Sequence, residues 1–61
     1  MPFIRVEMLD GRTLDQKKEI AEVLSQNLAR IVNCRVDDVQ VVITEVSREN
    51  WSTGGILQSH R

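Results

Sequence analysis

Cysteine, histidine, proline and tyrosine are scarce in this 61-residue sequence, which contains one cysteine, one histidine, one proline and no tyrosine. Cys34 cannot form an internal disulfide, and together with the lone His60 it offers too few ligands for a zinc site. Chains without disulfides are typical of the reducing cytosol. We therefore expect a cytoplasmic protein with no metal site.

Long apolar runs and an excess of positive charge are also missing. The longest aliphatic run, Val41–Ile43, is far shorter than the ~20 apolar residues of a membrane span. The first ten residues include Arg5, Glu7 and Asp10, so we expect no signal peptide. Eight Lys and Arg against nine Asp and Glu give a formal charge of -1, which argues against partners such as nucleic acid or a membrane surface.

The apolar residues that are present follow three periodic patterns. Residues 3–9 alternate between apolar and polar, which predicts a strand. Apolar residues recur every three or four positions in 14–32, which predicts a helix, and Thr13 with Gln16 forms a capping-box pattern at its start. The β-branched residues of 39–46 predict a second strand.

This order predicts an α/β fold, a small β-α-β unit over residues 1–61 with two parallel strands and one right-handed crossover helix. Gly54–Gly55 predicts a short C-terminal hairpin, and Gln58–Arg61 are expected to be a tail. One helix covers only one face of the sheet, which leaves Phe3, Leu9 and Val42 without packing partners. A chain this short, with no disulfide or metal, also buries little apolar area. We therefore expect an oligomer.

Pro2 is the residue most suggestive of chemistry, because it directly follows Met1. Methionine is removed readily before a small residue, and its removal exposes a secondary amine. An α-amino group has a pKa near 7.7–8.0, and apolar surroundings lower it toward the working pH of a general base. Pro2 is also tolerated simply as the start of a strand. If Met1 stays attached, the Pro2 nitrogen is a tertiary amide and cannot act as a base.

The ordered segments Pro2–Thr13, Gln16–Lys18, Val42–Glu45 and Gly54–Gly55 together resemble the 4-oxalocrotonate tautomerase family. The resemblance covers almost the whole chain. It implies β-α-β subunits that assemble as homohexamers, built as trimers of dimers. It also implies an isomerase, a keto-enol tautomerase that acts on an unsaturated α-keto acid without a cofactor.

The resemblance also implies roles for individual residues. Pro2 is expected to be the catalytic base, and Arg12 the catalytic arginine that holds the substrate carboxylate. Trp51 is expected to line the substrate pocket, with Leu9 as a further substrate-binding residue. Gln40 stands where the family has a second arginine. We expect it to hydrogen-bond a substrate oxygen while stabilising negative charge less well than an arginine.

Several alternatives stay open at this stage. Arg5, Arg35 and Arg48 are the candidates to replace the charge that Gln40 lacks. Pro2 could instead remain protonated and act as an acid in hydration or dehalogenation of an unsaturated acid, with Glu45 as the nearest carboxylate to activate water. Without catalysis, the chain would be an oligomeric assembly module.

Overall fold

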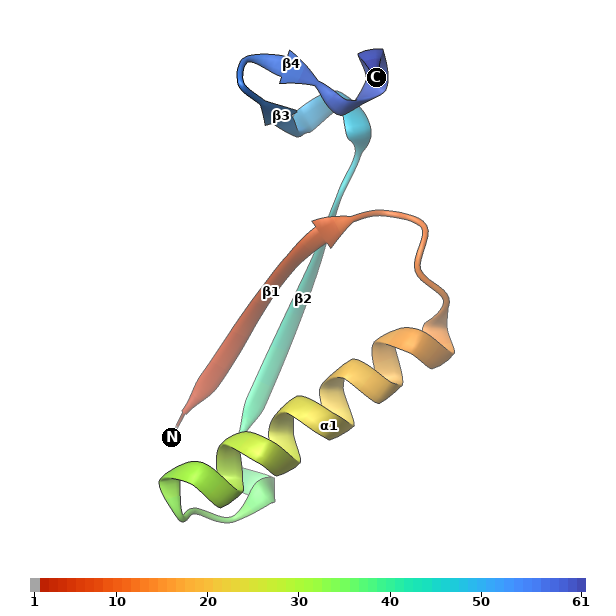
Figure 1. Cartoon of the computed structure of the whole chain (residues 1–61). Helices are drawn as coiled ribbons and strands as arrows, with labels where there is room; N and C mark the ends of the chain where they lie inside the picture. Colours follow the sequence, from red (N-terminus) through yellow and green to blue (C-terminus); the bar gives the residue numbers. More distant parts are fainter. Residues whose placement is uncertain (1) are drawn as a thin grey trace.

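The computed structural model describes residues 2–61 (Figure 1). Its regular elements are, in chain order, β1 (Phe3–Leu9), α1 (Leu14–Val32), β2 (Gln40–Val46), β3 (Ser52–Thr53) and β4 (Ile56–Leu57). The predicted order and the helix bounds are confirmed. The second strand begins one residue later than predicted, because the Val39 N–H bonds to the Val36 carbonyl in a 3-10 turn.

The two long strands are parallel and in continuous register from the pair Phe3–Gln40 to the pair Leu9–Val46. Backbone hydrogen bonds extend this ladder past both ends. The Gln40 N–H donates to the Pro2 carbonyl at 3.1 Å, and the Asp10 N–H donates to the Val46 carbonyl at 3.0 Å. Pro2 and Asp10, which flank β1, are therefore also held by backbone hydrogen bonds to β2.

Local sequence explains where α1 begins and ends. The Thr13 side chain accepts from the Gln16 N–H at 3.1 Å, and the Gln16 side chain accepts from the Thr13 N–H at 3.0 Å, so the predicted capping box is present. Asn33 ends the helix with a left-handed φ of 60°, a conformation that asparagine tolerates.

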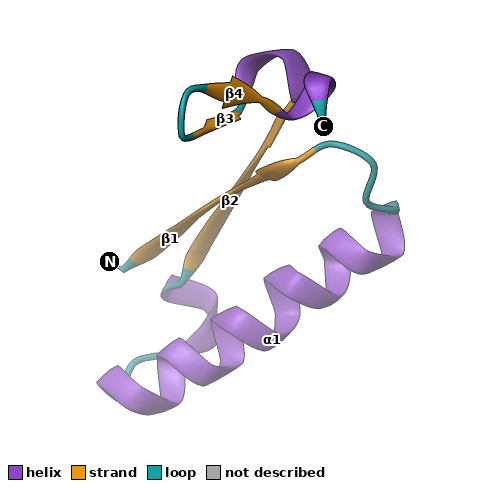
Figure 2. Cartoon of the chain, turned by 45° about the horizontal axis from the view of Figure 1, so that its top comes forward, coloured by secondary structure: helices purple, strands orange, loops and turns teal. Residues whose placement is uncertain are grey.

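The C-terminal segment extends past the carboxyl end of β2 and does not cover the sheet (Figures 1 and 2). Strands β3 and β4 are antiparallel, and both turn residues, Gly54 and Gly55, have positive φ. The sequence predicted a tail from residue 58, and this is wrong for Gln58–His60, which form a 3-10 turn. The Gln58 side chain contributes to that order by donating to the Thr53 hydroxyl at 3.1 Å.

Helix α1 lies against one face of the β1–β2 sheet, as predicted (Figures 1 and 2). The strand residues that alternate toward this face are half-buried: Ile4, Val6, Met8, Val41 and Ile43. On the uncovered face, Phe3 is 58% exposed and Val42 is 48% exposed. Leu9, which was expected to share that exposure, is half-buried at the end of β1.

The described residues form almost no fully buried core. Ala29 is the only buried apolar residue among them, and the predicted apolar stripe of α1 is partly open, with Ile31 67% exposed. The radius of gyration is 14.5 Å, whereas a compact chain of this length has about 10.5 Å. The accessible surface is 4842 Å², whereas about 4,000 Å² is typical for 7.0 kDa. The isolated chain thus leaves apolar surface for a partner to cover.

None of the helices within residues 2–61 combines the length and the apolar character that crossing a membrane requires.

Candidate functional site

Pro2 lies directly before β1, at the end of the sheet where both long strands begin. It is half-buried, and its carbonyl accepts the hydrogen bond from Gln40 that places it beside the first residue of β2. The predicted removal of Met1 lies outside the described residues. The structure therefore brings Pro2 and Gln40 together through the backbone.

Gln40 is exposed on the uncovered face of the sheet, opposite Phe3. Arg5 follows on the same face, opposite Val42, and its Cζ lies 5.9 Å from the centroid of the Phe3 ring. That distance is within the range of a cation–π contact. We call this end of the sheet, with Pro2, Phe3, Arg5 and Gln40, the proline end.

The two other arginines considered as substitutes for the missing charge lie outside β1 and β2, before and after the second strand. Arg35 forms an exposed ion pair with Asp37 at 3.3 Å. Arg48 lies in the 3-10 turn Arg48–Asn50, which follows β2 at the opposite end of the strand from Gln40. Of the three, Arg5 is the one that lies within the sheet on the same face as Gln40.

Arg12 lies in the short loop between β1 and α1, and its neighbours on both sides are fixed. Gly11 has a φ of 112°, which an L side chain rarely adopts, and Thr13 is held by the capping box. The Arg12 side chain is exposed and borders a hollow of about 420 Å³. This hollow is lined otherwise by residues from about two and a half turns of the helix: Gln16, Glu19, Ile20, Val23 and Leu24.

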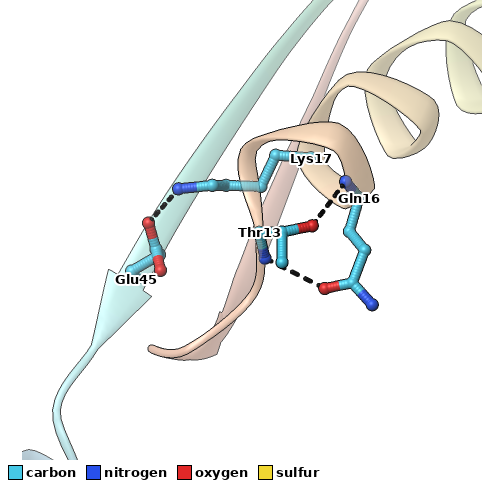
Figure 3. A network of polar contacts seen from close by, with 4 residues as sticks. All are labelled: Thr13, Gln16, Lys17 and Glu45. Atoms are coloured by element: carbon cyan, nitrogen blue, oxygen red, sulfur yellow. Dashed lines mark hydrogen bonds and ion pairs between the residues drawn. The ribbon is translucent and has the colours of Figure 1, made fainter.

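An ion pair that the sequence analysis did not predict lies next to this loop. Lys17 Nζ, in the first turn of α1, is 2.6 Å from Glu45 Oε1, near the end of β2 (Figure 3). The hydrogen bond from Lys17 lowers the pKa of Glu45 below its ordinary value of 4.5, although partial burial acts in the opposite direction. The backbone N–H of Gly11 also lowers this pKa, with the smallest contribution.

Topology is the signal that would have revealed this pair. In a β-α-β unit, the crossover helix begins at the carboxyl end of the first strand, beside the carboxyl end of the parallel strand. Lys17 and Glu45 are 28 residues apart in sequence, but both lie at that end. Opposite charges at these two positions therefore indicated an ion pair once the register was known.

Trp51 is half-buried after the 3-10 turn Arg48–Asn50, and its carbonyl accepts from the Gln58 N–H at 2.8 Å. Together with Glu7, Val46, Asn50 and Ser52 it lines a hollow of about 270 Å³. Leu9 pairs with Val46 in the sheet, so Leu9 lies at the same end of the strands. We call this end of the sheet, with Leu9, Arg12 and Trp51, the arginine end.

The two ends are far apart in one chain. The seven residue steps from Pro2 to Leu9 follow an extended strand, which at ~3.3 Å per residue separates them by about 23 Å. Pro2 lines neither of the two hollows described above. The structure thus places Pro2 beside Gln40 at one end of the sheet and Leu9, Arg12 and Trp51 at the other end, where Arg12 and Trp51 border different hollows.

Cys34 and His60 take no part in either end. Cys34 is half-buried after α1, and His60 is exposed in the last 3-10 turn. Within residues 2–61, no three His, Cys, Asp or Glu side chains are grouped so that they could hold a metal ion.

Comparison with known proteins places this geometry in a family context. The family model described as "Tautomerase enzyme" matches residues 2–61. A 2-hydroxymuconate tautomerase from Pseudomonas putida is 41% identical over 56 residues, which are 92% of this chain and 89% of that protein. A 2-hydroxymuconate tautomerase from Comamonas testosteroni is 38% identical over the same shares of the two chains.

Solved structures agree with these sequence relatives. The crystal structure of a 4-oxalocrotonate tautomerase homologue superimposes with a TM-score of 0.94 at 31% identity, covering 100% of this chain and 97% of the other. A heterohexamer 4-oxalocrotonate tautomerase from Chloroflexus aurantiacus gives a TM-score of 0.93 at 36% identity, covering 97% and 95%. The β-α-β fold with its C-terminal hairpin is therefore shared with these proteins.

Proposed function

Because the chain belongs to the tautomerase family and is an isomerase of that kind, we propose that it interconverts the enol and keto forms of an unsaturated α-keto acid. The observation that carries this proposal is the 41% identity to a 2-hydroxymuconate tautomerase over 92% of the chain. No cofactor is part of the proposal, because enolisation beside a carbonyl needs only a base and a group that stabilises negative charge.

In this proposal the Pro2 amine, freed by removal of Met1, is the general base. It takes the proton from the enol hydroxyl, the C–O bond becomes a carbonyl, and the electron pairs of the conjugated system shift. The protonated amine then returns the proton to a carbon further along that system, which restores the base. Support comes from the position of Pro2, which is half-buried and fixed beside β2 by its bond from Gln40.

Arg12 is proposed to bind the substrate carboxylate. A guanidinium presents paired N–H donors that match the two carboxylate oxygens. Two features support this role. The Arg12 side chain is exposed, and it takes part in neither of the two salt bridges found within residues 2–61.

Gln40 is proposed to donate a hydrogen bond to a substrate oxygen beside Pro2. A neutral amide stabilises a developing negative charge less than an arginine does. Arg5 supports this step as a cation on the same face, held over the Phe3 ring. The proline end therefore offers one neutral donor and one cation to the reacting oxygen atoms.

We propose further that a complete site needs more than one copy of the chain. The arginine end of one copy would supply Arg12, Leu9 and Trp51 to the proline end of another, because about 23 Å separates the two ends within a chain. The chain exposes about 800 Å² more than a compact chain of its mass, which is close to one partner's share of a stable interface. A homohexamer, as a trimer of dimers, is the proposed assembly, and one structural relative is a heterohexamer.

Hydration with Pro2 as an acid is less well supported, because that reaction needs a carboxylate to activate water. Glu45, the candidate that the sequence suggested, lies near the far end of β2 from Pro2 and is bound to Lys17 at 2.6 Å, and its lowered pKa makes it a weaker base. No described feature favours this reaction over tautomerisation.

The test of the proposed function is turnover of 2-hydroxymuconate or phenylenolpyruvate by protein whose intact mass shows that Met1 is absent. We expect activity in that protein and a loss of about tenfold or more in Pro2→Ala, whose primary amine lacks the ring that orients the nitrogen. Equal activity of the two proteins would remove Pro2 from the mechanism. Native mass spectrometry of the same sample counts the subunits.

A further inference from the structure

The loop that carries Arg12 is held by a contact from a strand 28 residues away. We propose that Glu45 is a positioning residue that, with Lys17, holds Arg12 ready to bind the substrate carboxylate. This inference rests on the proposed function of Arg12. Glu45 belongs to β2, whereas Lys17 belongs to the first turn of α1, so their contact joins the sheet to the start of the helix (Figure 3).

Both sides of Arg12 are anchored in the structure. Before it, the Asp10 N–H donates to the Val46 carbonyl at 3.0 Å, which ties the start of the loop to the end of β2. After it, Thr13 closes the capping box, and the Lys17 N–H donates to the Thr13 carbonyl at 3.1 Å. Glu45 is the residue of this set that ties β2 to the first turn of α1, through its ion pair with Lys17.

The Lys17–Glu45 ion pair matters more for the position of the Arg12 loop than for the free energy of folding. The Lys17 and Glu45 side chains are 27% and 31% exposed, and exposed pairs contribute little to folding. An exposed arginine on a free loop loses conformational entropy when it binds a ligand, and an ordered loop loses less. A shift of about 1 Å in a substrate-positioning group can cost up to about a hundredfold in rate.

The ion pair has a second consequence for Arg12, which is electrostatic. Glu45 is an anion close to the loop and could itself attract the guanidinium. Because Lys17 Nζ lies 2.6 Å from Glu45 Oε1, the negative charge of Glu45 is compensated within the pair. Arg12 is thereby left to bind an external anion.

The experiment compares Glu45→Ala and Glu45→Gln with Asp37→Ala, the matched control. Asp37 also belongs to an ion pair, with Arg35, but that pair is exposed and remote from the Arg12 loop. We expect Glu45→Ala to raise KM for phenylenolpyruvate about tenfold while kcat changes less than about twofold, because a carboxylate clamp acts on binding. Glu45→Gln keeps an oxygen acceptor, and we expect a smaller rise, about threefold.

A purely structural role for Glu45 would give a different pattern. It would lower the thermal midpoint without raising KM, and that result overturns the inference. A rise in KM no larger than that of Asp37→Ala overturns it as well. If Glu45→Ala does not fold, Glu45→Gln, which preserves shape and the acceptor, decides the question alone.

A measurement without turnover separates this inference from the proposed function. The Arg12 Nε–Hε resonance is followed by NMR during titration with phenylpyruvate, in the wild-type chain and in Glu45→Ala. We expect about tenfold weaker binding in the variant, even if the wild-type chain shows no Pro2-dependent turnover. Equal binding by both proteins, or no binding by the wild type, overturns the inference.

Discussion

The proline end and the arginine end of this chain are built by different means. At the proline end, backbone pairing alone places Pro2 beside Gln40, and the side chains of that face are exposed. At the arginine end, a capping box, an ion pair and a glycine with positive φ order the loop around Arg12. In the proposed function, the chain thus orders its anion-binding end by itself, whereas the surroundings of the proposed base depend on other copies.

Blocking the proline end should produce the largest effect. We expect chains that retain Met1 to lose about 10²–10⁴-fold in kcat, because a tertiary amide nitrogen has no basic lone pair and general base catalysis contributes about that much. The measurement is turnover of two samples that intact mass identifies as processed and unprocessed. Comparable turnover would show that the base lies elsewhere.

Removing the cation at the arginine end should have the next largest effect. We expect Arg12→Ala to lower kcat/KM about 10–100-fold, since a hydrogen bond to a charged group contributes about 1.5–3 kcal/mol. Arg12→Lys keeps the charge but loses the paired donors, so steady-state kinetics should place it between the wild type and Arg12→Ala. If lysine and alanine behave alike, geometry matters more than charge.

Adding a cation at the proline end should raise activity, whereas the two changes above lower it. We expect Gln40→Arg to raise kcat/KM up to about tenfold for a dicarboxylate such as 2-hydroxymuconate, and less for phenylenolpyruvate, because the new guanidinium can pair with the second carboxylate. The ratio of the two kcat/KM values is the measurement. An unchanged ratio would indicate that Arg5 already supplies the charge.

Weakening the helix start should cost stability at the arginine end only. We expect Thr13→Ala to reduce the free energy of unfolding by about 1 kcal/mol, the usual cost of losing an N-cap side chain. Urea unfolding checks this value. Ser25→Ala, within the same helix, serves as the control, and a loss of similar size there would contradict a specific capping effect.

Lowering the pH should have the smallest effect, and only at the arginine end. The pKa of Glu45 is lowered in the folded chain, so the stabilisation is fully present above its ordinary value of 4.5 and is lost as the pH falls through the lower folded value. We expect Lys17→Met to be less stable than the wild type near pH 7, and the difference to shrink as the pH falls further below 4.5. A difference that stays constant with pH would point to packing by the lysine stem.

Local patterns predicted most of the fold because the forces that form these elements are local. The spacing of apolar residues located the helix at 14–32, and Thr13 with Gln16 marked its start. Alternation separated the two faces of the strands. The errors came at segment ends, where a 3-10 turn ends at Val39 and another forms at Gln58–His60 through hydrogen bonds that periodicity does not encode.

The candidate site was less predictable than the fold. Pro2, Gln40 and Arg12 were selected by position and by family resemblance, and their site roles stay predictions. The Lys17–Glu45 ion pair was missed, because it joins residues 28 positions apart and depends on the register of β1 with β2. The exposure of Ile31 was also missed. An apolar stripe indicates which face of a helix is suited to burial, but it does not indicate which residues cover that face.

Composition and periodicity by themselves determined the helix, the strands and their order. The scarcity of cysteine and histidine also left Pro2 and a few arginines as the main candidates for chemistry. Only the tertiary structure decided that Arg12 and Trp51 lie at one end of the sheet and Pro2 at the other, and that Glu45 is paired with Lys17. The reason is physical. Helix caps and alternation act over a few residues, whereas contacts between strand ends require the parallel register that forms when the whole chain folds.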